Sequence, residues 1–191
     1  IAVHESTLRP AQIVDVRGLP CLPPARCAVD LARALPRPDA LAVLDGALRA
    51  RRCTPADLAS ELVAHGRLRG VRQARGLIGL ATGLAGCRQE SHLRLLLHDA
   101  GLPAPAPQLG VADERGLVRY RIALAYEEER VGVEYDGAPR PGRAPADRHR
   151  HNWLATRGWQ LHHVTDADLY HSPQGLVATV RAGLRAARPA R

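Results

Sequence analysis

The first half of the chain repeats apolar residues at the three- and four-residue intervals of amphipathic helices. Residues 1 to about 22 are predicted to be extended segments and turns, with a strand at Ile13–Val16 and a turn at Arg17–Pro20. Helices are then predicted at about 23–35, 38–48, 54–66, 71–84 and 88–99. Thr54 and Pro55 are typical of a helix start, because Thr caps the first turn and Pro fits its first position.

The apolar period changes to the two-residue alternation of strands after the Pro-rich segment 102–107. Three strands are predicted at 108–111, 120–125 and 130–136, followed by a helix at 145–157, a strand at 160–164 and a helix from about 172 to 188. This order predicts the α/β class, with a helical N-terminal half and a small mixed sheet flanked by helices. We expect two domains, at residues 1–85 and 86–191.

The charge balance favours a polyanionic partner such as DNA. The net charge is +8, and all 27 basic residues are Arg, a side chain that contacts phosphate and guanine edges at two points. The enrichment in Arg, Ala, Gly and Pro is explained equally well by a GC-rich genome.

Other features of composition narrow the class of protein. No apolar run is long enough to span a membrane, and the spacings of the four Cys fit no zinc motif. We therefore expect a cytoplasmic protein with reduced thiols. Because the chain has no Met and begins at Ile1, we expect a fragment that lacks an N-terminal module.

The strand at 130–136 carries the strongest chemical signal. Alternation places Glu134 and Asp136 on one face, where two carboxylates can share a divalent cation such as Mg²⁺ or Mn²⁺. Solvated acids on an edge strand are the alternative. A four-residue loop at 126–129 predicts that Arg121 opposes Glu134. In this register Ala123 shares the carboxylate face, where a nuclease would have a third acid.

The spacing of several short motifs resembles the Vsr-like endonuclease domain of the PD-(D/E)XK type, from Glu90 to about residue 185. The matching positions are Glu90-Ser91-His92-Leu93-Arg94, Gly101-Leu102-Pro103, Gln108, Arg121, Glu134-Tyr135-Asp136-Gly137, Asp147, Arg150, Leu154, Gly158 and Trp159. The resemblance implies a hydrolase acting on DNA, with Glu90, Glu134 and Asp136 as catalytic residues. It also implies a metal held by Glu134 and Asp136.

Two departures from that family bear on activity. Its acid aligns with Ala123, and its His after the Glu-Tyr-Asp-Gly motif aligns near Arg140. A degenerate active site that is impaired in cleavage is therefore our first hypothesis. The second is a residually active nuclease in which Glu90 supplies the missing ligand.

The third hypothesis is a non-enzymatic DNA-binding regulator or antitoxin-like module of a toxin–antitoxin system, with a toxin or another protein as partner. The upstream helices resemble the segment that precedes this domain in related chains. There an AbiEi-type antitoxin winged helix often comes first, and we expect that module to be missing here. We also expect DNA contacts by Arg94, Arg121, Arg140, Arg148 and Arg150, with Gln108 and Asp147 in support, because Arg148 and Arg150 lie in a basic cluster that follows the loop of Arg140. For Arg121 a structural role, or neutralisation of Glu134 across the strands, is the alternative. For Arg94 a surface pair with Glu90 is the alternative, and for Arg148 and Arg150 a solvated helix face.

Overall fold

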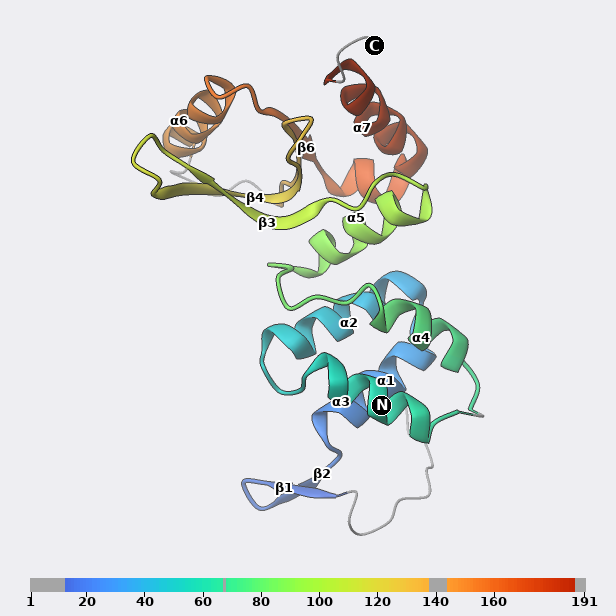
Figure 1. Cartoon of the computed structure of the whole chain (residues 1–191). Helices are drawn as coiled ribbons and strands as arrows, with labels where there is room; N and C mark the ends of the chain where they lie inside the picture. Colours follow the sequence, from blue (N-terminus) through green and yellow to red (C-terminus); the bar gives the residue numbers. More distant parts are fainter. Residues whose placement is uncertain (1–12, 67, 138–143, 188–191) are drawn as a thin grey trace. The chain divides into compact units, whose positions relative to one another are not determined.

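The computed structural model describes residues 13–66, 68–137 and 144–187 (Figure 1). The chain divides into two compact units, residues 1–83 and residues 84–191. Helices fill the first unit, and the second contains a four-stranded mixed sheet flanked by helices. The α/β class predicted from the sequence is therefore confirmed. Over the described ranges, no helix combines the length and the apolar character needed to cross a bilayer.

The first unit consists of a short hairpin and a cluster of helices. Its elements are β1 (Val14–Val16), β2 (Leu19–Cys21), α1 (Pro24–Ala34), α2 (Arg37–Arg49), α3 (Pro55–Ala64) and α4 (Val71–Ile78). The helices bury Leu, Val and Ala side chains between them, namely Ala28, Val29, Ala32, Ala40, Leu41, Leu44, Leu58, Leu62, Val71, Ala74 and Leu77. The hairpin leaves Val16 and Leu19 exposed.

The ends of the helices follow local chemistry. Thr54 caps α3 by accepting a hydrogen bond from the Asp57 amide at 3.1 Å, while Asp57 accepts one from the Thr54 amide at 2.8 Å. The predicted helix at 71–84 is too long, because α4 ends at Ile78. Gly79 and Gly83 lie in the remainder of the predicted helix, and Gly disfavours helix through its backbone entropy.

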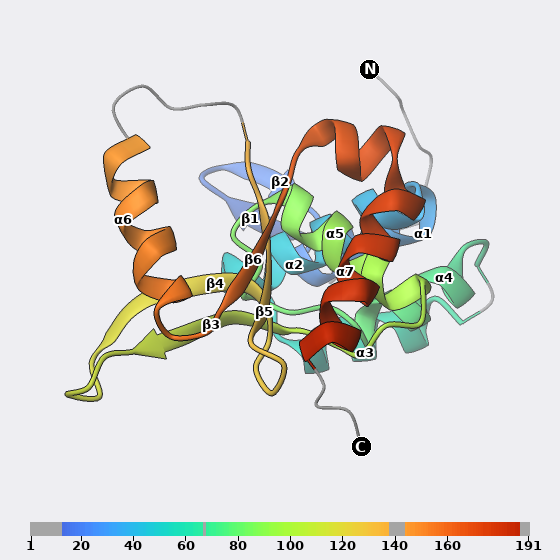
Figure 2. The same ribbon diagram turned by 90° about the horizontal axis from the view of Figure 1, so that it is seen from above.

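The second unit forms a sheet with helices on both faces. Its elements are α5 (Arg88–Asp99), β3 (Ala106–Ala112), β4 (Val118–Tyr126), β5 (Val131–Tyr135), α6 (Ala144–Ala155), β6 (Gln160–Val164), a π-helical turn η2 (Ala167–His171) and α7 (Pro173–Ala187). The strand order is β3-β4-β5-β6. The first two pairs are antiparallel and β5-β6 is parallel. Figure 2 shows α6 on one side of the strands, with α5 and α7 on the other.

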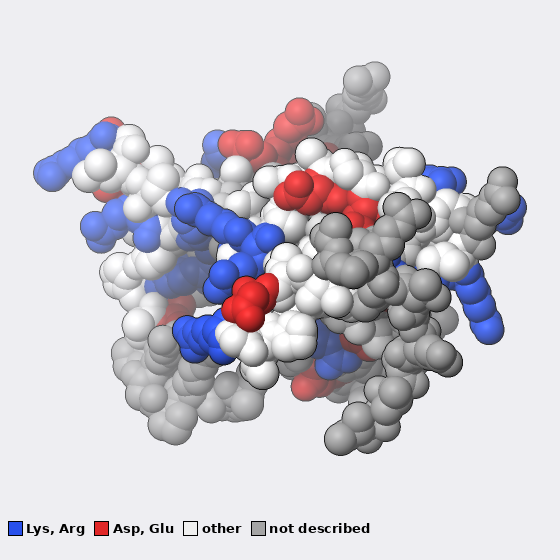
Figure 3. Space-filling model, turned by 90° about the horizontal axis from the view of Figure 1, so that it is seen from below, with Lys and Arg blue, Asp and Glu red and all other residues white. Residues whose placement is uncertain are grey.

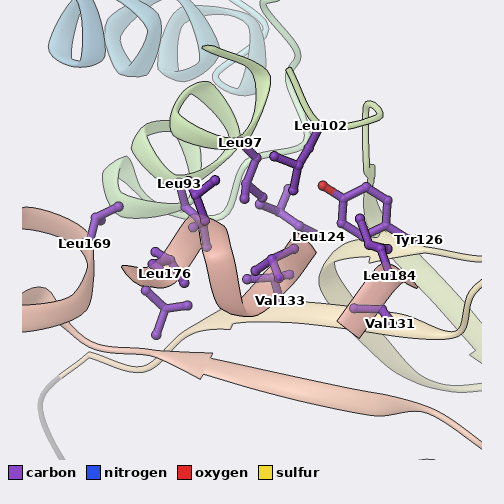
Figure 4. Close-up of a cluster of buried hydrophobic side chains, with 13 residues drawn as sticks. Leu93, Leu97, Leu102, Leu124, Tyr126, Val131, Val133, Leu169, Leu176 and Leu184 are labelled. Atoms are coloured by element: carbon purple, nitrogen blue, oxygen red, sulfur yellow. The ribbon is translucent and has the colours of Figure 1, made fainter. Parts of the chain in front are cut away.

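Each face of the sheet has its own apolar cluster. On the α5 and α7 side, Leu124, Tyr126, Val131 and Val133 pack against helix residues that include Leu93 (Figure 4). On the α6 side a smaller cluster consists of buried Ile122, Ala125 and Leu154, with Leu109, Val111, Trp153, Trp159 and Leu161 packed around it. Two covered faces explain why a sheet of four short strands is stable here.

The β4–β5 hairpin has a different register from the predicted one. Its turn spans residues 127–130, so that Tyr126 pairs with Val131 and Ala125 pairs with Gly132. The sequence prediction placed the turn one residue earlier and paired Ala125 with Arg130, which is wrong. Arg121 therefore does not oppose Glu134. Arg130 adopts a positive φ of 51° in the true turn, a conformation that the alternation pattern does not reveal.

The facing of β4 changes near Ala123. Ile122 and Ala125 belong to the α6-side cluster, although they lie three residues apart, whereas Leu124 belongs to the opposite cluster. A regular strand returns to one face every two residues, so the alternation is interrupted between these positions. Gln108 lies on β3 between the pairs Pro107–Leu124 and Leu109–Ile122 and has a φ of 52°. The sheet is thus irregular where the candidate site begins.

Candidate functional site

Glu134 lies at the end of β5 and faces α6. The residue is buried, with 8% of its surface exposed. A buried carboxylate requires a compensating partner, because the desolvation of an unpaired charge is costly. In this structure the partner is a side chain of α6, and it determines whether the carboxylate of Glu134 is available to another ligand.

Arg150 supplies that compensating charge through a two-point ion pair. Its Nη1 donates to Glu134 Oε2 at 2.7 Å and its Nη2 donates to Glu134 Oε1. The same Nη2 donates to the backbone carbonyl of Arg121 at 2.8 Å. The hydrogen bond with Glu134 raises the pKa of Arg150 above its ordinary value. The guanidinium is therefore held in one position by a carboxylate and a main-chain oxygen.

Aromatic side chains surround this ion pair on the α6 side. The guanidinium carbon of Arg150 lies 5.9 Å from the ring centre of Tyr120. The Tyr120 hydroxyl lies 3.1 Å from His149 Nδ1, and its ring packs edge to face on Trp153 at 5.2 Å. Together, these contacts fasten α6 to β4 around the Arg150–Glu134 pair.

Asp136 has a separate partner on β6. Its Oδ2 lies 3.0 Å from His163 Nδ1, and its side chain is 57% exposed. The ring of His163 lies 5.7 Å from that of His151 on α6. Glu134 lies on β5 and Asp136 follows its last residue, Tyr135, so the predicted strand is one residue too long at this end. Each acid contacts a different basic side chain.

The residue between the two acids points to the other face. The Tyr135 hydroxyl donates to Asp166 Oδ1 at 2.9 Å. This hydrogen bond to a carboxylate raises the pKa of Tyr135 to about 12. The phenol therefore stays protonated at neutral pH and links β5 to the segment that follows β6.

Glu90 occupies the start of α5. Its Oε2 accepts hydrogen bonds from the Gly86 amide at 2.7 Å and from Gln108 Nε2 at 3.0 Å. The structure thus brings together Glu90 and Gln108, two residues that the sequence assigned to the site. Their contact connects α5 to the irregular point of β3.

The implied divalent metal does not fit the side chains as they are placed. Through the described ranges, no group of three or more His, Cys, Asp or Glu side chains is arranged to hold an ion. The guanidinium of Arg150 already brings a positive charge to both oxygens of Glu134. At position 123, where Vsr-like endonucleases have an acid, the small side chain of Ala offers no oxygen ligand. We therefore derive no chemical step through a metal.

The arginines assigned to DNA contact are in different environments. Arg94 is partly buried on α5, Arg121 donates to the Gln108 carbonyl at 3.1 Å, and Arg150 is held by Glu134. Arg148 is exposed on α6, whose first turn carries the exposed Asp147. Arg140 lies outside the described residues.

Sequence reasoning missed the partners of Glu134 and Asp136. The ion pair between Arg150 and Glu134 joins residues 16 positions apart, and the contact of Asp136 with His163 joins neighbouring strands. The parallel pairing of Glu134 with His163 across β5 and β6 was the missing information.

Residues 1–80 match the family described as AbiEi antitoxin C-terminal domain. The sequence analysis expected an AbiEi-type winged helix to be missing from this chain. The match of residues 1–80 associates the helical half itself with an AbiEi antitoxin.

Two similar proteins come from strains of Mycobacterium tuberculosis. The "Uncharacterized protein Rv2248" of strain ATCC 25618 / H37Rv and the "Uncharacterized protein MT2308" of strain CDC 1551 / Oshkosh are each 33% identical over 183 residues. The aligned region covers 94% of this chain and 67% of each relative. No solved structure matches the chain.

Proposed function

The chain belongs to the same family as the mycobacterial protein Rv2248, and we propose that it acts as a DNA-binding, antitoxin-like regulator. The observation that carries the proposal is the match of residues 1–80 to an AbiEi antitoxin C-terminal domain. An antitoxin-type domain implies a toxin or another protein as partner and DNA as a ligand. Such a role places the protein in the cytoplasm.

The charge of the chain supports the DNA part of this proposal. A net charge of +8 attracts the phosphate backbone regardless of base sequence. On the face drawn in Figure 3, Arg side chains gather in groups, with some acidic side chains beside them. Grouped arginines concentrate the positive potential, which favours a polyanion over a small ligand.

For the second unit we propose a binding role in place of hydrolysis. The resemblance to Vsr-like endonucleases assigns catalysis to Glu90, Glu134 and Asp136. Two of these carboxylates contact a basic side chain, and Glu90 accepts hydrogen bonds from Gly86 and Gln108. A carboxylate held at both oxygens by a guanidinium is a structural anchor, and displacing that guanidinium leaves a buried charge unpaired.

A salt-titrated binding assay tests the proposal on the whole chain. We expect the purified protein to bind a fluorescein-labelled duplex, with binding measured as a rise in fluorescence anisotropy. The logarithm of Kd should increase linearly with the logarithm of the salt concentration. Because the role requires no metal, EDTA should leave the affinity unchanged. Absence of binding at low salt, or cutting of the duplex on addition of Mg²⁺, would count against the regulator and in favour of another function.

A further inference from the structure

We propose that the exposed face of α4 and the segment just before it contact the phosphate backbone of duplex DNA, through Arg69, Arg72 and Arg75. This inference rests on the proposed function and locates its DNA contact in the first unit. None of the three arginines was assigned to DNA from the sequence.

The helical period separates these arginines from the core. Val71, Ala74 and Leu77 of α4 are buried, whereas Arg72 and Arg75 lie on the exposed side. Arg69 precedes the helix and is also exposed. Of the contacts made by described residues, none engages the guanidinium of these three arginines, in contrast to Arg150. Their charge is therefore available to a partner.

The surrounding sequence does not neutralise this charge. From Leu62 to Gln89 the chain contains no Asp or Glu. The carboxylates of neighbouring helices have other partners. Asp30 binds Arg26 and Arg33 of its own helix, Asp45 accepts from the Thr82 amide at 2.7 Å, and Glu61 lies 3.6 Å from Arg26.

The backbone that carries the arginines is held firmly against α1. Gly70 has a φ of 82°, and a Cβ there would lie 2.2 Å from the Arg33 carbonyl oxygen. Arg33 Nε donates to the Arg69 carbonyl at 3.0 Å. Gln73 Nε2 donates to the carbonyls of Ala32 and Leu35 at the end of α1, each at 2.9 Å. A rigid base reduces the entropy lost when the side chains bind a partner.

The surface beside these arginines is hollowed. A depression of about 320 Å³ is lined by Gly66, Leu68, Gly70, Val71, Arg72 and Arg75. Two of these lining residues, Arg72 and Arg75, carry guanidinium groups. The depression is bordered by arginines and by no acidic residue among those that line it. Such a surface is suited to an extended polyanion, whose successive phosphates approach several arginines together.

The test compares two triple variants of the full chain with equal loss of charge. One is Arg69→Gln/Arg72→Gln/Arg75→Gln. The matched control is Arg115→Gln/Arg119→Gln/Arg185→Gln, which removes three exposed charges of the second unit. Both are titrated with a fluorescein-labelled mixed-sequence duplex at several salt concentrations, and circular dichroism checks that each variant is folded.

We expect the α4 variant to bind about tenfold more weakly or worse near physiological salt, with a salt slope lower by about three. The control should retain most of the affinity. If the two variants bind as well as the unmodified chain, or weaken equally, the α4 surface is not the DNA contact and this inference fails while the proposed function stands. If the unmodified chain does not bind DNA at all, both fail.

Discussion

Arg150 and Glu134 form a two-point ion pair that joins α6 to the end of β5. The Glu134 side chain is 11% exposed and that of Arg150 is 23% exposed. A pair in this environment differs from a surface ion pair, because the loss of one partner leaves a poorly hydrated charge behind. The ion pair therefore bears on both the stability of the second unit and its chemistry.

Removing the arginine should destabilise the fold. We expect Arg150→Met to lower the free energy of unfolding by about 2–4 kcal/mol, because Glu134 loses its only charged contact in the described structure. A double-mutant cycle with Glu134→Gln should give a coupling energy of about 2 kcal/mol, measured by urea denaturation.

A surface pair provides the control for that cycle. Glu114 is 94% exposed and lies 3.2 Å from Arg157, so Glu114→Gln should change the free energy of unfolding by less than about 0.5 kcal/mol. Equal effects of Glu114→Gln and Arg150→Met would show that the Arg150–Glu134 pair contributes no more than a solvated one.

Introducing at position 123 the acid found in Vsr-like endonucleases should not produce cleavage. We expect neither the unmodified chain nor Ala123→Asp to cut plasmid DNA with Mg²⁺ or Mn²⁺, because the guanidinium of Arg150 still binds both oxygens of Glu134. Gel analysis of supercoiled, nicked and linear forms measures the outcome. Metal-dependent cutting that disappears in Glu134→Gln would contradict this expectation and revive the nuclease hypothesis.

Two glycines of the first unit should respond oppositely to Ala. Gly70 has a positive φ, and an added Cβ would collide with the Arg33 carbonyl oxygen, so Gly70→Ala should cost more than about 2 kcal/mol. Gly46 lies in α2 with no atom within 4 Å of an added Cβ. Gly46→Ala should therefore stabilise by about 0.5–1 kcal/mol through helix propensity.

Thermal unfolding by circular dichroism distinguishes these two effects. The prediction for Gly70 fails if Gly70→Ala melts at the temperature of the unmodified chain, because the left-handed backbone and the close approach would then be absent. A lower melting temperature for Gly46→Ala would instead show that this position is more crowded than the structure indicates.

His162 should make stability depend on mildly acidic pH. Its Nε2 is buried without a hydrogen-bond partner among the described residues and lies near Gly183 of α7. Burial, followed by the charge of His163, lowers the pKa of His162 below 6.5. The unfolded chain therefore takes up a proton first as pH falls, and the free energy of unfolding decreases below about pH 6.5 until the folded pKa is passed.

Urea denaturation at a series of pH values measures this dependence. In His162→Gln the decrease in stability below pH 6.5 should be shallower, since the substituted side chain does not titrate. An unchanged pH dependence in His162→Gln would assign the effect to other groups.

The amino-acid sequence by itself determined the succession of elements and the balance of charge. Apolar spacing is a local property, so it located the helices of both units and the strands at 120–125 and 130–136. Alternation also placed Glu134 on the strand that became β5, although it extended that strand to Asp136, one residue beyond its end at Tyr135. The predicted α4 end was wrong because the apolar period continues past Ile78, although Gly79 and Gly83 lower the helix propensity of that segment.

Only the tertiary structure decided which side chains meet. A turn displaced by one residue changes the opposing residue in a hairpin by two positions, and the apolar pattern tolerates both registers because the facing stays the same. The approach of Arg150 to Glu134 depends on how α6 packs across β4 and β5. That packing buries residues that are far apart in the sequence. The spacing of the motifs therefore predicted a positive charge at Glu134, but it did not predict that the guanidinium of Arg150 would be that charge.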